Sequence, residues 1–144
     1  MSSDVNIWVS SGSASSPYYT FYLDSSGTTE LHDRTLYLSN NYTFYRLNNS
    51  TDHPFYISDN GYEGTSTSNI SLSGDGSASS GITGTQSFTL SFNGLTTSDS
   101  LSYYCTSHSG MISTFSLSEN IIVNGLLELN VSTSTFNIDS EVVK

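Results

Sequence analysis

The sequence predicts a single all-β domain, built as a β-sandwich or small barrel, and several observations support this fold class. The chain has 144 residues and a mass of 15.6 kDa, which suits one compact unit with one core. Ser, Thr, Asn and Gly are abundant, and these residues favour turns and pleated surfaces over helix interiors. Aromatic residues make up 12% of the chain and supply apolar surface for a core. Turn residues recur about every ten positions, the spacing expected of roughly eight short strands.

The N-terminal segment 1–16 is predicted to be an arm or a first edge strand. Val5, Ile7 and Val9 alternate with polar residues, as in a half-buried strand. A Ser- and Gly-rich stretch then runs up to Pro17, and such composition is typical of a flexible connection.

Strands are predicted over most of the segment 17–118. The clearest lies at 87–92, where Phe88, Leu90 and Phe92 alternate with polar residues and share one face. Small polar residues dominate 59–84, which predicts a long loop region with one or two short strands. The other predicted strands, each bounded by turn residues, are 18–23, 36–38, 42–47, 53–58, 101–105 and 111–117.

The C-terminal segment 119–144 continues beyond the last predicted strand of the sandwich. Its first half carries several aliphatic residues, and apolar side chains left in water promote aggregation. We therefore expect this extension to cover part of its own domain or part of a partner. The predicted organisation is an arm (1–16), a sandwich (17–118) and an extension for packing or assembly (119–144).

The charge of the chain excludes two classes of partner. Three Lys and Arg residues against thirteen Asp and Glu residues give a formal charge of −10 and a pI near 4.2. Such a surface repels nucleic-acid phosphates and anionic lipids, so we expect no nucleic-acid and no membrane partner. The sequence shows no apolar run of membrane-spanning length and no secretory leader. As written, the chain is predicted to be neither membrane-spanning nor exported by a signal of its own.

Residue types that bind metals gather between two predicted strands. Cys105, His108 and Met111 occupy one short loop, and His53 opens an upstream apolar strand. A thiolate favours Cu(I), imidazoles accept Cu(II), and a thioether is a weak axial donor, so this set has the ligand types of a trigonal copper site with an axial Met. A lone cysteine cannot form an intramolecular disulfide. The sequence therefore indicates a candidate copper site.

In these residues the chain resembles the cupredoxins, the small blue-copper proteins. The segment similar to the first-ligand segment of that family reads His53-Pro54-Phe55. The segment similar to its C-terminal ligand loop, in the short amicyanin-like spacing, reads Tyr104-Cys105-Thr106-Ser107-His108-Ser109-Gly110-Met111. The resemblance spans residues 17–118 and keeps the ligand order of the family.

The resemblance implies a Greek-key β-sandwich of two sheets and a type 1 copper site. It implies that the metal ligands are His53, Cys105, His108 and Met111. Several members of the family carry an Asn directly after the first His, where it helps to tie the two ligand loops together. This chain has Pro54 at that position, so the sequence does not show how its loops are tied.

Other interpretations of the same residues stay open. Cys105 can be a small buried residue, His53 a hydrogen-bonded residue at a strand end, and Met111 a filler of a gap in the core. A nucleophile and base pair of Cys105 and His108 is disfavoured, because both lie in one tight loop without an orienting amide or carboxylate. The chain is therefore not predicted to be an enzyme.

Two further groups have weaker claims to a function. Asp59, Glu63 and Asp75 lie in a Gly-rich segment but lack the regular ligand spacing of a calcium site. His32 lies between Glu30 and Asp33 and is interpreted as a solvated turn residue.

The function that we expect first is a structural role in the virion of a tailed phage, as a capsid decoration or a tail-associated protein built on a cupredoxin-like domain. The Lys-poor composition, rich in Ser, Thr, Gly, Asn and Tyr, is similar to that of virion-surface proteins. The chain also resembles cupredoxin-like domains of marine phage structural proteins, which have a similar ligand loop. The expected partners are the major capsid or tail proteins, with a homo-oligomer or array on a particle assembled in the host cytoplasm.

The alternative function is a soluble blue-copper electron-transfer protein of the periplasm or the extracellular space. His108 would be the exposed ligand through which the electron leaves. The acidic surface would steer the protein to a positively charged redox partner.

Overall fold

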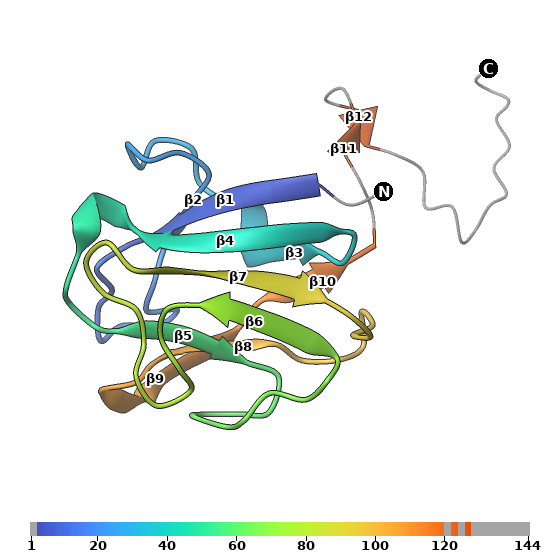
Figure 1. Cartoon of the computed structure of the whole chain (residues 1–144). Helices are drawn as coiled ribbons and strands as arrows, with labels where there is room; N and C mark the ends of the chain where they lie inside the picture. The colour runs from blue at the N-terminus through green and yellow to red at the C-terminus, as the bar shows by residue number, and fades with distance from the viewer. Residues whose placement is uncertain (1–2, 120–121, 124–125, 128–144) are drawn as a thin grey trace, which may run out of the picture.

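The computed structural model describes residues 3–119, 122–123 and 126–127, and within them the fold is all-β (Figure 1). The only helical elements among these residues are two short 3₁₀ turns, η1 (His32–Arg34) and η2 (Leu47–Asn49). The sequence prediction of an all-β class is therefore confirmed. The strands are β1 (Ser3–Val9), β2 (Phe21–Tyr22), β3 (Thr35–Tyr37), β4 (Asn40–Arg46), β5 (Phe55–Ser58), β6 (Ile70–Gly74), β7 (Ser87–Phe92), β8 (Ser102–Cys105), β9 (His108–Thr114), β10 (Ser116–Ser118), β11 (Ile122–Val123) and β12 (Leu126–Leu127).

The larger sheet has five strands in the order β2-β1-β4-β7-β6. β1 and β4 are parallel over the whole of β1, from Ser3 opposite Asn40 to Val9 opposite Arg46, and the other neighbours are antiparallel. The sequence predicts an arm or a first edge strand for residues 1–16. In the structure β1 is not an edge strand, since it lies between β2 and β4. The alternation of Ile7 and Val9 places both side chains, each 0% exposed, in the core.

The smaller sheet is antiparallel and has three strands in the order β5-β8-β9. Its register places Phe55 opposite Cys105. Two strand pairs lie outside these sheets, the parallel pair β3 and β10 and the antiparallel pair β11 and β12.

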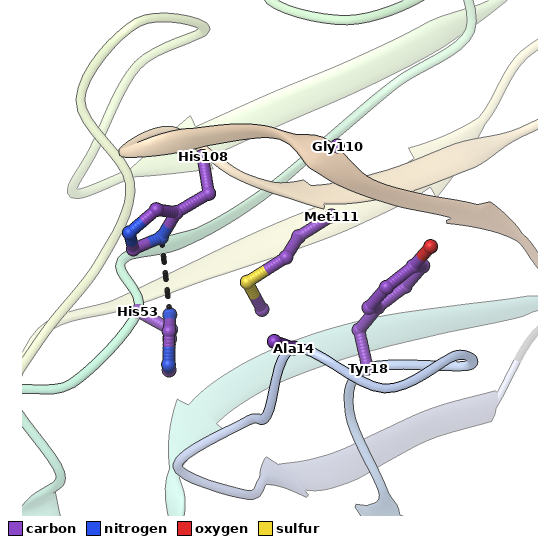
Figure 2. Close-up of a pocket in the computed structure, with 6 residues that line it drawn as sticks. All are labelled: Ala14, Tyr18, His53, His108, Gly110 and Met111. Atoms are coloured by element: carbon purple, nitrogen blue, oxygen red, sulfur yellow. Dashed lines mark hydrogen bonds between the residues drawn. The ribbon is translucent and has the colours of Figure 1, made fainter.

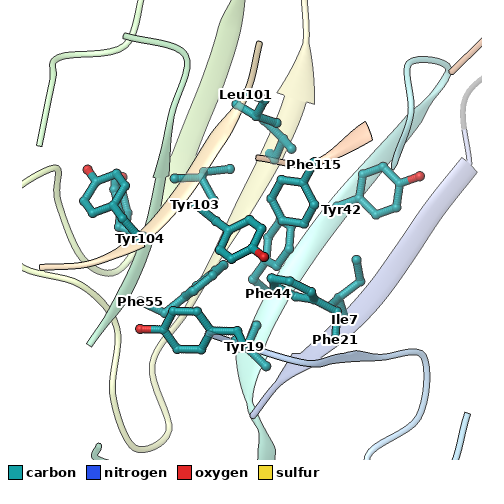
Figure 3. Close-up of a cluster of buried hydrophobic side chains, with 14 of the residues drawn as sticks. Ile7, Tyr19, Phe21, Tyr42, Phe44, Phe55, Leu101, Tyr103, Tyr104 and Phe115 are labelled. Carbon is teal, nitrogen blue, oxygen red and sulfur yellow. The ribbon is translucent and has the colours of Figure 1, made fainter. Parts of the chain in front are cut away.

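One aromatic core joins the two sheets (Figure 3). Phe44 of β4 and Phe88 of β7 belong to the larger sheet, and their rings lie 5.7 and 6.1 Å from the ring of Phe55 on β5. All three side chains are almost fully buried, and burying such a ring stabilises a fold by about 2–3 kcal/mol. The start of β5, close to His53, and the end of β8, at Cys105, therefore lie against a closely packed core.

Several predicted strands have different limits in the structure. The strand at 87–92 is confirmed as β7. The strand predicted at 18–23 shortens to β2, because Tyr18 has a positive φ of 75° within a tight turn that closes with a hydrogen bond from Ser13 N–H to the Tyr18 carbonyl. The strand predicted at 111–117 divides into β9 and β10 around Phe115, whose side chain is buried and whose N–H donates to the Leu101 carbonyl.

The C-terminal extension predicted at 119–144 lies almost entirely outside the described residues. Within it the structure describes residue 119 and the short β11 and β12. Among the described residues, no helix has the length and apolar character needed to cross a membrane.

Candidate metal centre

Cys105 and His108 face each other across one tight hairpin. Cys105 ends β8, His108 begins β9, and only Thr106 and Ser107 separate them. The two residues are paired in the register of the strands, and directly opposite residues of antiparallel strands hold their side chains about 5 Å apart or closer. Cys105 Sγ consequently lies 3.4 Å from His108 Nδ1.

His53 reaches the same place from a distant part of the chain. Only Pro54 separates His53 from Phe55, the first residue of β5. β5 pairs with β8 so that Phe55 lies opposite Cys105. His53 has a φ of 49°, in the left-handed region that residues with a side chain rarely adopt. Its Nδ1 lies 3.3 Å from the Nδ1 of His108, as Figure 2 shows, and 3.8 Å from Cys105 Sγ.

These three donor atoms form a triangle of the size that a bound metal ion requires. All of them lie within 4.8 Å of one another. The point equidistant from the three atoms lies about 2 Å from each, which is the length of a metal–imidazole bond. His53, Cys105 and His108 could therefore hold a metal ion, and among the described residues they are the only group of His, Cys, Asp and Glu side chains that meets this condition.

Met111 lies beside the triangle. The pairing of β8 with β9 shifts between Tyr104 and Cys105, so three residues of β9, from Ser109 to Met111, have no partner on β8. Such bulges redirect side chains, and here Met111 is 4% exposed and extends toward the two imidazoles (Figure 2). Met111 therefore lies on the side of the two imidazoles and lines the same cavity as they do.

A cavity of about 290 Å³ opens next to these side chains. The surrounding residues come from the connection between β1 and β2, the segment before β5, and β9 (Figure 2). Its lining consists of Ala14, Tyr18, His53, His108, Gly110 and Met111. His108 and Gly110 are exposed, whereas Cys105 is 0% exposed, so solvent reaches the cluster from the imidazole side.

Hydrogen bonds tie together the two segments that carry His53 and Cys105. The N–H of Thr106 donates to the Pro54 carbonyl at 3.0 Å, which joins the hairpin to the segment after His53. The Thr106 hydroxyl accepts a bond of 2.9 Å from the Gly81 N–H. On the other side, the Tyr62 hydroxyl donates to the Cys105 carbonyl at 2.7 Å. Pro54 thus keeps the link between the loops, because its carbonyl serves as the acceptor.

Arg46 and Tyr19 support the segment that carries His53, and neither was predicted as a site residue. Arg46 is 2% exposed and donates to the Asp52 carbonyl at 2.7 Å. The Tyr19 hydroxyl donates to the His53 carbonyl at 2.7 Å. Burial raises the pKa of the Tyr19 phenol well above its usual range, and the nearby Cys105 raises it further, so the hydroxyl stays a donor.

The remaining residues considered for a function lie elsewhere. His32 belongs to η1, is exposed, and has its Nε2 2.9 Å from Asp33 Oδ2, in agreement with a turn residue. Asp59 accepts hydrogen bonds from Thr67, and Asp75 accepts one from the Ser87 N–H, so both carboxylates serve loop structure.

No known protein family matches the chain, and neither a curated protein nor a solved structure matches it. The donor geometry of His53, Cys105 and His108 is consequently the observation on which a function has to rest.

Proposed function

We propose that the chain is a cupredoxin-like domain that binds one copper ion in a type 1 site and transfers single electrons. The observation that carries this proposal is the triangle of two imidazole nitrogens and one thiol sulfur, with separations of 3.3, 3.4 and 3.8 Å. Copper bound there would exchange one electron between Cu(II) and Cu(I). The fold proposed with it is the Greek-key sandwich, supported by the two sheets that share one core and by the parallel pairing of β1 with β4.

The chemistry of the donors favours copper over other metals. A thiolate and a thioether are soft ligands that suit Cu(I), whereas imidazole accepts both oxidation states. Zinc prefers four strong ligands, and in the described part of the chain no carboxylate or further imidazole joins the triangle. Met111, which lines the same cavity as the two imidazoles, would supply the additional donor, and a weak thioether is the axial ligand typical of copper electron-transfer sites.

The protein side chains have separate tasks in such a centre. Cys105 is fully buried and Met111 nearly so, which keeps water from the sulfur donors. The bonds from Thr106 and Tyr62 hold the hairpin in place before a metal arrives, so the donors need little rearrangement. His108 is exposed and gives an electron the shortest route to a partner.

A spectroscopic titration tests this proposal. Cu(II) is added to the metal-free protein while the thiolate-to-copper charge-transfer band in the visible range is recorded. We expect an intense band that saturates at one equivalent. Cys105→Ser should abolish it, and His108→Gln should weaken copper binding strongly, whereas His32→Gln, which removes the exposed histidine of η1, should leave it unchanged. Absence of the band from the wild-type protein contradicts the proposal.

A structural role in a tailed-phage virion is the second candidate function. The composition, poor in Lys and Arg and rich in Ser, Thr and Asn, favours it, and copper binding is compatible with it. Its test is co-sedimentation of the protein with purified particles, with and without residues 119–144. We expect the full chain to sediment with particles and the shortened chain to stay in solution with copper binding intact. Recovery of the full chain only in the soluble fraction contradicts this role.

A further inference from the structure

Arg46 is the one buried cation among the described residues, and it lies behind the segment that carries His53. One guanidinium nitrogen donates to the Ile82 carbonyl at 2.9 Å, and the other donates to the carbonyls of Ser10 at 2.9 Å and Asp52 at 2.7 Å. These acceptors belong to three separate loops. Within the described residues no carboxylate is hydrogen-bonded to the guanidinium: carbonyl oxygens hold it, and the Asp52 carboxylate acts on its charge only from a distance.

The bond to Asp52 acts directly on His53. The Asp52 carbonyl and the His53 nitrogen belong to one planar peptide unit, so a bond that fixes the oxygen also fixes the orientation of the His53 backbone N–H. The next peptide is fixed as well, because the Tyr19 hydroxyl donates to the His53 carbonyl. The left-handed φ of 49° at His53 therefore lies between two anchored peptides. A conformation of this kind persists only where its surroundings determine it.

We propose that Arg46 is a positioning residue of the candidate metal centre, which holds the His53 peptide in place and keeps a positive charge without a hydrogen-bonded carboxylate behind the donor triangle. The claim about the charge rests on the proposed copper site. The claim that Arg46 holds the His53 peptide concerns the metal-free protein and does not depend on copper.

The charge has a consequence for the two oxidation states of copper. Covalent geometry places the guanidinium about 5 Å from the His53 Cα and no more than about 10 Å from the donor triangle. A positive charge at that distance in a protein interior disfavours Cu(II) more than Cu(I). With an effective dielectric constant of about 20, the ratio of Cu(I) to Cu(II) affinity changes about tenfold.

Two substitutions of Arg46 separate the two roles. Arg46→Lys keeps the charge but loses the fork of donors that reaches three carbonyls. Arg46→Gln keeps a hydrogen-bond donor but removes the charge. Arg34→Lys is the matched control, because Arg34 is the only other arginine and donates to none of these carbonyls.

The first measurement is NMR of the metal-free protein. In the wild type and in Arg34→Lys we expect cross-relaxation between the rings of His53 and His108, whose centroids lie 5.0 Å apart. In Arg46→Lys this contact should be lost, while the core signals of β4 and β7 persist. Survival of the contact in Arg46→Lys overturns the positioning role, whether or not the protein binds copper.

The second measurement compares the affinities for Cu(I) and Cu(II) by competition with chelators. We expect Arg46→Lys to weaken both affinities without a change in their ratio, and Arg46→Gln to lower the ratio of Cu(I) to Cu(II) affinity about tenfold. An unchanged ratio in Arg46→Gln overturns the charge role. Should Arg46→Gln not fold, Tyr19→Phe decides instead: it releases the His53 carbonyl but keeps the charge, so a changed ratio in that variant overturns the charge role. If wild-type protein forms no charge-transfer band, the copper proposal fails and the NMR result still decides the positioning role.

Discussion

His53 shows how much of the site depends on single hydrogen bonds. Its imidazole meets the other two donors only while its backbone keeps a left-handed φ, and no glycine is there to make that conformation inexpensive. Bonds from Arg46, Tyr19 and Thr106 reach the residues on either side of it. The geometry of the ligand is thus set by neighbours that do not touch the metal position themselves.

Thr106 offers a test of this principle at the level of one hydroxyl. Thr106→Val removes the acceptor of the Gly81 N–H but leaves the backbone bond to Pro54 intact. Because a partly buried donor is then left without a partner, we expect the free energy of unfolding of the metal-free protein to fall by about 1–2 kcal/mol. Urea unfolding measures this. Thr106→Ser, which keeps the hydroxyl, should lose clearly less, and equal losses in both variants would contradict this role of the hydroxyl.

The sequence singled out His53, Cys105 and His108, which the structure brings together as a candidate metal site, but it did not indicate the residues that support them. Cys105, His108 and Met111 stand together in the chain, and their residue types alone suggested soft-metal chemistry. Arg46 and Tyr19 act through the main-chain carbonyls of Asp52 and His53, and any residue can supply a carbonyl. The one available indication was the position of Arg46 in the alternating pattern of its strand, where it shares the buried face with Tyr42 and Phe44. A cation on that face requires polar partners.

Among the secondary-structure elements, the hairpin of β8 and β9 determines the spacing of the donors. The two-residue turn brings Cys105 and His108 into register, and the following bulge directs Met111 toward them. The strand limits in this region were only partly predictable. The sequence placed the start of the strand at 111, where apolar residues begin, but β9 starts at His108 because the ladder with β8 closes directly after the turn. Pairing across strands overrides local composition here.

Lengthening that turn should separate fold from metal binding. We expect insertion of one glycine between Thr106 and Ser107 to weaken Cu(II) binding at least tenfold, because Cys105 and His108 no longer face each other. Fluorescence unfolding should show only a small loss of stability, since the aromatic core is untouched. Insertion of a glycine after Thr97, in the exposed turn between β7 and β8 at the other end of β8, is the control and should leave copper binding unchanged. Equal copper affinity in both insertion variants would refute the dependence on register.

At the scale of the whole molecule, the dominant property is its negative charge. The formal charge is −10, and the chain contains only three Lys and Arg residues. One of these cations, Arg46, is buried. A partner that is attracted to this protein by charge therefore needs a cationic face.

Salt should reveal this property in the kinetics of electron exchange. With the protein loaded with Cu(I), we expect the second-order rate constant for its oxidation to Cu(II) by a cationic cobalt(III) complex to fall severalfold as salt rises from 10 mM to 500 mM, because screening removes the attraction. With the anion ferricyanide the same change in salt should raise the rate constant. Stopped-flow absorbance of the charge-transfer band follows both reactions. Parallel responses of the two reagents would show that net charge does not govern the encounter.

The unequal exposure of Cys105 and His108 has a consequence for the proposed copper site. An ion arriving from solvent would meet the imidazole of His108 at the surface first, because the sulfur of Cys105 is 0% exposed. Such an ion would therefore bind nitrogen before sulfur, entering beside the exposed His108 and Gly110.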